Sequence, residues 1–195
     1  MTTNEFEKLN SALKSEANTI LHDYGLLEML GGYGKPTILG SYSLNLMTWR
    51  DLDIHLESNQ MTIKDFFNLG LDIATRLRPR RMSFRNEFIG NTPNLPRGFY
   101  WGIYTKLSFP EEWKIDIWAL DSDQAKSLLK RFRDLEKKMS KENRPAILAI
   151  KSHFCRHPEY RKSFSSFDIY KSVIEDKIRS PEEFSRWLKN NKRIE

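Results

Sequence analysis

Apolar and polar positions alternate strictly in the short stretch DLDIHL at residues 51–56. Asp51, Asp53 and His55 fall on one face of an extended chain, and the leucine and isoleucine residues between them fall on the other. This alternation predicts a half-buried β-strand over residues 51–58. Because one face of the strand belongs to the core, the opposite face places two aspartates side by side where chemistry can take place.

The rest of the chain divides into helical and extended segments. Apolar residues at helical spacing predict helix within residues 3–30, which the sequence GGYGKP at 31–36 ends. A short strand at 37–39 and a helix at 62–79, with Thr62 as its N-cap, are expected next. Further strands are predicted at 81–90, 98–109 and 113–120. From residue 121 the pattern is helical, with segments at 121–139, 144–156, 167–178 and 181–189.

The order of these elements indicates an α+β fold, in which a mixed β-sheet with flanking helices is followed by a C-terminal helical bundle. We therefore expect a sheet-containing domain at residues 1–120 and a helical region at residues 121–195. No linker-like composition marks the boundary.

Charge and composition narrow the class of protein. The 195 residues, 39% of them apolar, are enough to bury a core, and the net charge is +6. Residues 121–195 hold 19 Lys and Arg against 12 Asp and Glu, which suits an anionic partner such as nucleotide phosphates or RNA, although many solvated helices are similar. The chain has no apolar run of membrane-spanning length, no signal-peptide pattern and one cysteine, so we expect a cytoplasmic protein without a membrane partner.

The paired aspartates suggest a metal site. Asp51 and Asp53 repel each other when both are ionised, unless a cation such as Mg²⁺ lies between them. Asp116 lies between two isoleucines in another predicted strand, and the Gly40–Ser41 pair follows a short apolar strand, where its backbone can approach phosphate closely. The alternatives are an edge strand that exposes its charges to solvent and a helix N-cap at Ser41.

Together these pieces resemble the signature of nucleotidyltransferases of the DNA polymerase β-like superfamily. The matching residues are Leu39-Gly40-Ser41, Asp51-Leu52-Asp53-Ile54 and Ile115-Asp116-Ile117, within residues 37–120. The resemblance implies that Asp51, Asp53 and Asp116 bind Mg²⁺, that Asp116 completes the catalytic site and that Gly40 and Ser41 hold a nucleoside triphosphate. The whole chain is similar to small members with a helical C-terminal part, including aminoglycoside and lincosamide nucleotidyltransferases.

Two further residues are weaker candidates. Glu87 shares the predicted strand 81–90 with Arg85 and is a candidate general base for an acceptor hydroxyl, or it forms an ion pair with Arg85. Arg85 belongs to a basic run that is a candidate triphosphate or nucleic-acid contact, or a solvated surface. His55 follows the aspartates on their face and is a substrate or metal contact, or a structural histidine.

The leading hypothesis is an Mg²⁺-dependent nucleotidyltransferase that moves a nucleoside monophosphate, with ATP as the expected donor, to a hydroxyl of a small molecule. A second hypothesis replaces the small molecule by RNA or a protein. A third, from another functional class, is a catalytically silent binding module such as an antitoxin-like partner.

Overall fold

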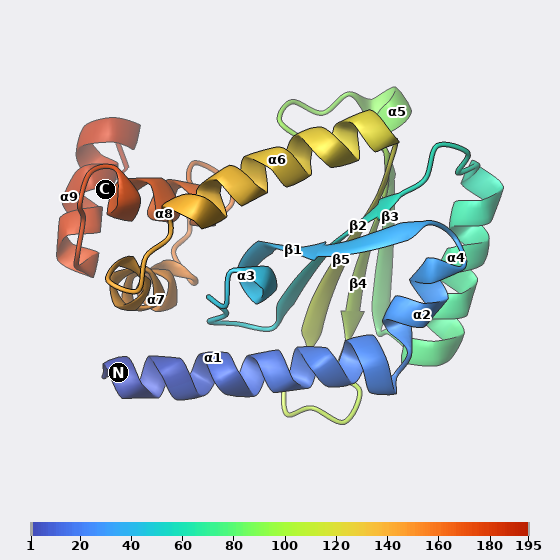
Figure 1. The fold of residues 1–195 in the computed structure, drawn as a ribbon, viewed down its shortest axis with the longest axis horizontal. Helices are drawn as coiled ribbons and strands as arrows, with labels where there is room; N and C mark the ends of the chain where they lie inside the picture. Colours follow the sequence, from blue (N-terminus) through green and yellow to red (C-terminus); the bar gives the residue numbers. More distant parts are fainter. Residues whose placement is uncertain (1, 195) are drawn as a thin grey trace.

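The computed structural model describes residues 2–194 and contains a five-stranded mixed sheet in the order β1-β2-β5-β4-β3 (Figure 1). The strands are β1 (Lys35–Leu39), β2 (Asp51–Glu57), β3 (Arg81–Asn86), β4 (Phe99–Thr105) and β5 (Trp113–Leu120). β2 and β5 run parallel to each other, and every other neighbouring pair is antiparallel.

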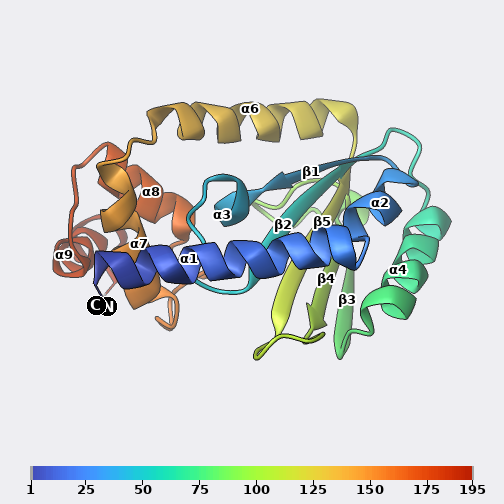
Figure 2. The same cartoon turned by 60° about the horizontal axis from the view of Figure 1, so that its bottom comes forward.

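Helices lie on both faces of this sheet and beyond one end of it (Figures 1 and 2). α1 (Thr3–Asn18) continues as one turn of π-helix, η1 (Thr19–Asp23), and is followed by α2 (Leu26–Gly31). Two four-residue helices, α3 (Gly40–Ser43) and α5 (Glu87–Gly90), follow strands β1 and β3, and α4 (Ile63–Leu77) lies between β2 and β3. The C-terminal helices are α6 (Ser122–Lys138), α7 (Asn143–Phe154), α8 (Ser166–Ile174) and α9 (Pro181–Lys192).

The alternation of residues along β2 and β5 separates the two faces of the sheet. Leu52, Ile54, Ile115 and Ile117 are fully buried in a core that also contains apolar residues of α1, α2 and α4. The intervening residues face the opposite side, which α6 covers beside β1 and β2. The sheet therefore has an apolar face and a polar face, as the sequence pattern predicts.

A second hydrophobic cluster lies among the C-terminal helices and includes Leu44 and Leu46 from the loop that precedes β2. α1 contacts both clusters, since Leu13 belongs to the sheet core and Phe6 packs against the second cluster. This long helix therefore joins the sheet to the C-terminal helices (Figure 2).

The α+β fold predicted from the sequence is confirmed, and so is the N-cap Thr62; α6 starts with Asp121 as its N-cap. The strand predicted over 81–90 is too long. The Asn86 side chain accepts a hydrogen bond from the Phe88 N–H at 3.1 Å, which starts α5 and places Glu87 in a helix instead of a strand. The division into domains at residues 1–120 and 121–195 stays a prediction.

Candidate active site

The structure brings the three predicted aspartates to one cleft of about 340 Å³. In the parallel pairing of β2 with β5, Asp53 lies directly opposite Asp116. Asp51 precedes Asp53 by two residues, so its side chain lies on the same face of the sheet. Residues 65 positions apart in the sequence therefore face the same cleft, because the two strands are neighbours.

The Gly40–Ser41 pair lines the same cleft, at the junction of β1 and α3. Gly40 has a φ of +65°, and a Cβ atom added there would lie 2.1 Å from Oδ2 of Asp53. Only glycine fits both the backbone conformation and the close approach to the carboxylate. The local sequence therefore fixes how β1 ends against the aspartates.

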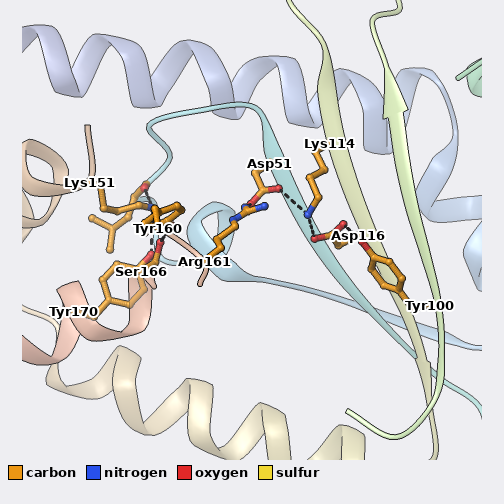
Figure 3. Close-up of polar contacts among 10 residues, drawn as sticks. Asp51, Tyr100, Lys114, Asp116, Lys151, Tyr160, Arg161, Ser166 and Tyr170 are labelled. Atoms are coloured by element: carbon orange, nitrogen blue, oxygen red, sulfur yellow. Dashed lines mark hydrogen bonds and ion pairs between the residues drawn. The ribbon is translucent and has the colours of Figure 1, made fainter. Parts of the chain in front are cut away.

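Two cationic side chains contact the aspartates directly (Figure 3). The Lys114 ammonium pairs with Asp116 and lies 3.8 Å from Oδ1 of Asp51. The Arg161 guanidinium, from the loop between α7 and α8, donates a hydrogen bond to Oδ2 of Asp51. These two groups offset the negative charge of the cleft.

The donor set of the cleft suits Mg²⁺, which prefers carboxylate oxygens. Oδ1 of Asp51 is buried and has no hydrogen-bond partner among residues 2–194. Burial, together with the charges of Asp51 and Asp116, raises the pKa of Asp53 to about 7. Within the same residues, no group of three or more His, Cys, Asp and Glu side chains is already arranged to hold a metal ion. Lys114 lies between two of the carboxylates, so a metal has to replace its ammonium group there.

The C-terminal helices complete the wall of the cleft facing the sheet. Lys151 on α7 is 1% exposed, and its ammonium donates to the Leu46 carbonyl at 2.7 Å and to the Tyr170 hydroxyl at 3.2 Å. Burial lowers the pKa of Lys151 to about 7, against the opposing effect of Asp51 and Asp53. An ammonium that is deeply buried beside an acidic cleft is a functional candidate.

A tyrosine and a phenylalanine add neutral groups to the site. The Tyr100 hydroxyl donates a hydrogen bond to Oδ1 of Asp116 at 2.7 Å, and burial together with Asp116 raises the pKa of Tyr100 (Figure 3). Tyr100 therefore stays protonated and holds this carboxylate in place. Phe167, at the start of α8, lines the cleft with 51% of its surface exposed.

No family model matches the sequence, and no curated protein matches it either. Solved structures do match. The Cid1 poly(U) polymerase bound to MgATP superposes with a TM-score of 0.60 at 13% identity, over 88% of this chain and 54% of that one. The polymerase core of TRAMP, an RNA surveillance complex, gives 0.56 at 14% identity, over 87% and 51%. The GLD-2/RNP-8 complex gives 0.52 at 12% identity, over 100% and 74%.

The chain shares the nucleotidyltransferase-like α+β fold of these structures. It spans about half the length of the Cid1 and TRAMP chains that it matches. In this chain, carboxylates on adjacent strands face the glycine–serine turn across the cleft.

Three residues predicted from the sequence do not line the cleft in which the three aspartates meet. Glu87 is 5% exposed and accepts hydrogen bonds from the Thr92 N–H and hydroxyl, which lower its pKa. Arg85 lies on the outer strand β3, 3.8 Å from Glu87, so the ion-pair reading of these two residues is confirmed. His55 faces α6, and burial lowers its pKa to about 4, so this side chain is neutral. None of the three lines the cleft that contains the aspartates.

Sequence reasoning missed Lys114, Lys151 and Arg161. The sequence did contain a signal for Lys114. It lies two residues before Asp116 on the same strand, so the two side chains share a face, as Asp51 and Asp53 do. Lys151 is a charge within the apolar helical run PAILAIK, which is a second signal. Arg161 lies in a loop with a φ of +65°, and no periodicity in the sequence marks it.

Proposed function

We propose that this protein is an Mg²⁺-dependent nucleotidyltransferase that moves a nucleoside monophosphate from a nucleoside triphosphate to an acceptor hydroxyl. The observation that carries the proposal is the meeting of Asp51, Asp53 and Asp116 on two adjacent parallel strands, with Gly40 packed against Asp53. Carboxylates fixed on rigid neighbouring strands are what a metal-assisted phosphoryl transfer requires.

Binding of the donor is assigned to groups on both sides of the cleft. The three aspartates would hold Mg²⁺, which would neutralise charge on the triphosphate and lower the pKa of the attacking hydroxyl. The backbone of Gly40 and Ser41 approaches the phosphates, and Lys151 and Arg161 supply positive charge from the helical side. The exposed ring of Phe167 offers a surface on which a base can stack.

The chain's own residues then direct the transfer. The acceptor oxygen forms a bond to the α-phosphorus, the bond from that phosphorus to the bridging oxygen breaks, and pyrophosphate leaves with the electron pair. Asp116 accepts the hydroxyl proton, and the hydrogen bond from Tyr100 keeps one of its oxygens in position. Lys114, which pairs with Asp116, would supply positive charge toward the leaving pyrophosphate if Mg²⁺ took its place at that carboxylate.

The base of the nucleotide donor and the chemical class of the acceptor are proposed separately from the reaction type. ATP is the donor we propose from the family resemblance, whereas matched Cid1 structures contain MgATP in one case and MgGTP in another. An RNA acceptor is the second candidate, because the matched proteins are named as a poly(U) polymerase and as an RNA terminal U-transferase.

The test is to incubate the protein with Mg²⁺ and labelled ATP, GTP, CTP or UTP, in the presence of a hydroxyl panel that contains sugars, sugar phosphates and a short oligoribonucleotide. We expect a labelled product and pyrophosphate with one class of acceptor, and loss of both by several orders of magnitude in Asp116→Asn. Absence of transfer, combined with no thermal stabilisation by Mg²⁺ and any triphosphate, would contradict the proposal and favour a binding module.

A further inference from the structure

A second cavity, of about 520 Å³, opens beside the aspartates and is not accounted for by nucleotide binding. Its lining overlaps that of the cleft described above, but Gly40 and Ser41 do not line it. The shared residues are Trp49, Asp51, Lys114, Tyr160 and Arg161. We call it the basic pocket; the walls that it does not share come from α1, from Thr48 and Arg50 before β2, and from Arg156 and His157 after α7. It therefore reaches Asp51 from a side away from the glycine–serine turn.

The charged groups of the basic pocket are mainly cationic. Arg50, Lys114, Arg156 and Arg161 line it, against the carboxylates of Asp51 and Glu111. Three of these cations already have carboxylate partners, whereas Arg156 is exposed and forms no ion pair with any of residues 2–194. Arg156 is therefore a free guanidinium at the wall of a pocket that leads to the aspartates.

Two further groups in the pocket are suited to a polar ligand. Nδ1 of His157 accepts a hydrogen bond from the Glu159 N–H at 3.2 Å, so in the neutral ring Nε2 carries the proton and is a donor. The Thr48 hydroxyl has no hydrogen-bond partner among residues 2–194, although its oxygen is buried in the pocket wall. Buried polar groups without a partner are uncommon and require an explanation.

The remaining walls are apolar and aromatic. Leu9 and Leu13 of α1 line one side, and Trp49 and Tyr160 line another, with their rings 5.5 Å apart in a T-shaped arrangement. These apolar surfaces can pack against the face of a ligand ring, and the polar groups of the pocket can form hydrogen bonds with the substituents of that ring. A ligand that fits has a ring, a hydroxyl that extends past Asp51 toward Asp116 in the neighbouring cleft, and a negative group near Arg156.

We propose that the basic pocket is the acceptor site and that it takes a sugar hydroxyl whose own or adjacent sugar carries a phosphate. The inference rests on the proposed function and deepens it. A polycationic acceptor such as an aminoglycoside is excluded, because it would meet the positive charge of Arg156 and its neighbours. A free sugar phosphate and the end of an oligoribonucleotide share the required chemistry, and experiment distinguishes these two sources.

Binding to the protein without nucleotide tests the proposal independently of catalysis. The probes are glucose 6-phosphate, glucose and glucosamine, which present anionic, neutral and cationic forms of one ring, and a tetraadenylate with a free 3′-hydroxyl. Binding is followed by calorimetry and by tryptophan fluorescence. We expect at least one of the two phosphate-bearing probes to bind, and neither glucose nor glucosamine to do so. Binding of glucose 6-phosphate identifies a small acceptor, and binding of the tetraadenylate alone identifies an RNA end.

A matched pair of variants separates the pocket from general attraction to a basic protein. Arg156→Gln should weaken binding of the phosphate probe about tenfold or more, since a hydrogen bond to a charged group contributes about 1.5–3 kcal/mol. Arg133→Gln removes the same charge from an exposed position on α6 outside the pocket and should leave the affinity unchanged. Equal effects of the two substitutions, or no preference for the phosphate probes, would overturn the proposal.

Failure of the acceptor site and failure of the proposed function give different results. If Mg²⁺ with a nucleoside triphosphate does not stabilise the protein, the proposed function fails, whereas the probe titrations still decide the nature of the basic pocket. If the nucleotide stabilises the protein and the phosphate probes do not bind, the pocket assignment fails alone.

Discussion

Asp53 is the aspartate of the cleft whose pKa is raised by burial and by repulsion from the other two carboxylates. Its carboxyl group is buried between Asp51 and Asp116, and these surroundings raise its pKa to about 7 from the reference value of 3.8. Lys114 and Arg161 act in the opposite direction. A group under such strain is expected to serve binding at the expense of stability.

Asp53→Asn should therefore separate stability from activity. The substitution keeps the shape of the side chain and removes one repelling charge. Without metal, the variant should therefore unfold at the same temperature as the wild type or at a higher one, because relieved repulsion adds up to about 0.5–2 kcal/mol to the free energy of unfolding. Mg²⁺ with a non-hydrolysable triphosphate should stabilise the wild type, by about 2.7 kcal/mol at 100 times the dissociation constant, and barely affect the variant. Thermal melts decide it: a destabilised variant that keeps the full ligand shift would make Asp53 a structural residue.

The same comparison has a predictable pH dependence. Because the folded protein holds the Asp53 proton more tightly than the unfolded chain, this group's contribution to stability is complete below about pH 4 and is lost as the pH rises to about 7. Asparagine does not titrate. The gain in melting temperature of Asp53→Asn over wild type, measured in EDTA, should be small at pH 4 and largest at pH 8. A gain that does not vary with pH would contradict this origin.

Lys114 is expected to compete with metal, since its ammonium contacts Asp116 and lies 3.8 Å from Asp51. Lys114→Met should lower the melting temperature in EDTA, because the carboxylates lose their counter-charge, and should tighten Mn²⁺ binding measured by electron paramagnetic resonance. A competition of ~1 kcal/mol corresponds to about a fivefold change in affinity. Lys64→Met, at an exposed position on α4, is the control and should change neither quantity. Weaker Mn²⁺ binding in Lys114→Met would show that Lys114 supports the metal site.

At the scale of the elements, the register between β2 and β5 determines whether a site exists. Asp53 lies opposite Asp116 in the parallel pairing. A shift of one residue would move every side chain of one strand to the other face of the sheet, and the buried isoleucines prevent it. The junction of β1 and α3 completes the site, because β1 pairs with β2 and ends with Leu39 opposite Asp53.

Gly40→Ala tests this junction. Alanine at a φ of +65° is strained, and its Cβ would meet Oδ2 of Asp53 at 2.1 Å, so we expect a loss of about 1–3 kcal/mol in the free energy of unfolding together with loss of the nucleotide-dependent stabilisation. Gly31→Ala is the matched control, because a Cβ at this last residue of α2 meets nothing within 4 Å. Its stability should be unchanged or slightly increased. Retention of the ligand shift in Gly40→Ala would remove this junction from the nucleotide site.

For the whole molecule, the C-terminal helices contribute both to the second hydrophobic cluster and to the site. Leu44 and Leu46 belong to this cluster. From the same region of the chain, Lys151 lines the cleft and Arg161 contacts Asp51. α1 is tied to the same region by a bidentate ion pair between Glu7 and Arg144, with distances of 2.8 and 2.6 Å. Residues of the sheet and residues of the C-terminal helices therefore line the same cleft.

Deletion of residues 122–195 is expected to abolish transfer and to leave an unstable sheet domain. Exposure of Leu44 and Leu46 alone costs about 1.5–3 kcal/mol each, against a total stability of about 5–15 kcal/mol for a typical domain. Circular dichroism melts and the transfer assay measure the two effects. A truncated protein that melts cooperatively and transfers at the full rate would contradict the role assigned to the helices.

The sequence by itself determined the elements and the identity of the acidic residues. The alternation about Leu52 and Ile115 indicated strands with one charged and one apolar face, and Thr62 indicated a helix start, because strand periodicity and capping are local properties. The same local rules failed at Glu87, where the Asn86 side chain ends a strand that β propensity would have continued.

Only the tertiary structure decided which side chains meet. Arg161 reaches Asp51 across 110 positions of sequence, and Lys151 reaches the Leu46 carbonyl across 105. No periodicity encodes such contacts, since they depend on how the helices after residue 121 pack against the loop before β2. The basic pocket arises for the same reason: it forms where α1, that loop and the segment after α7 come together, and each contributes residues with no chemical signal when read alone.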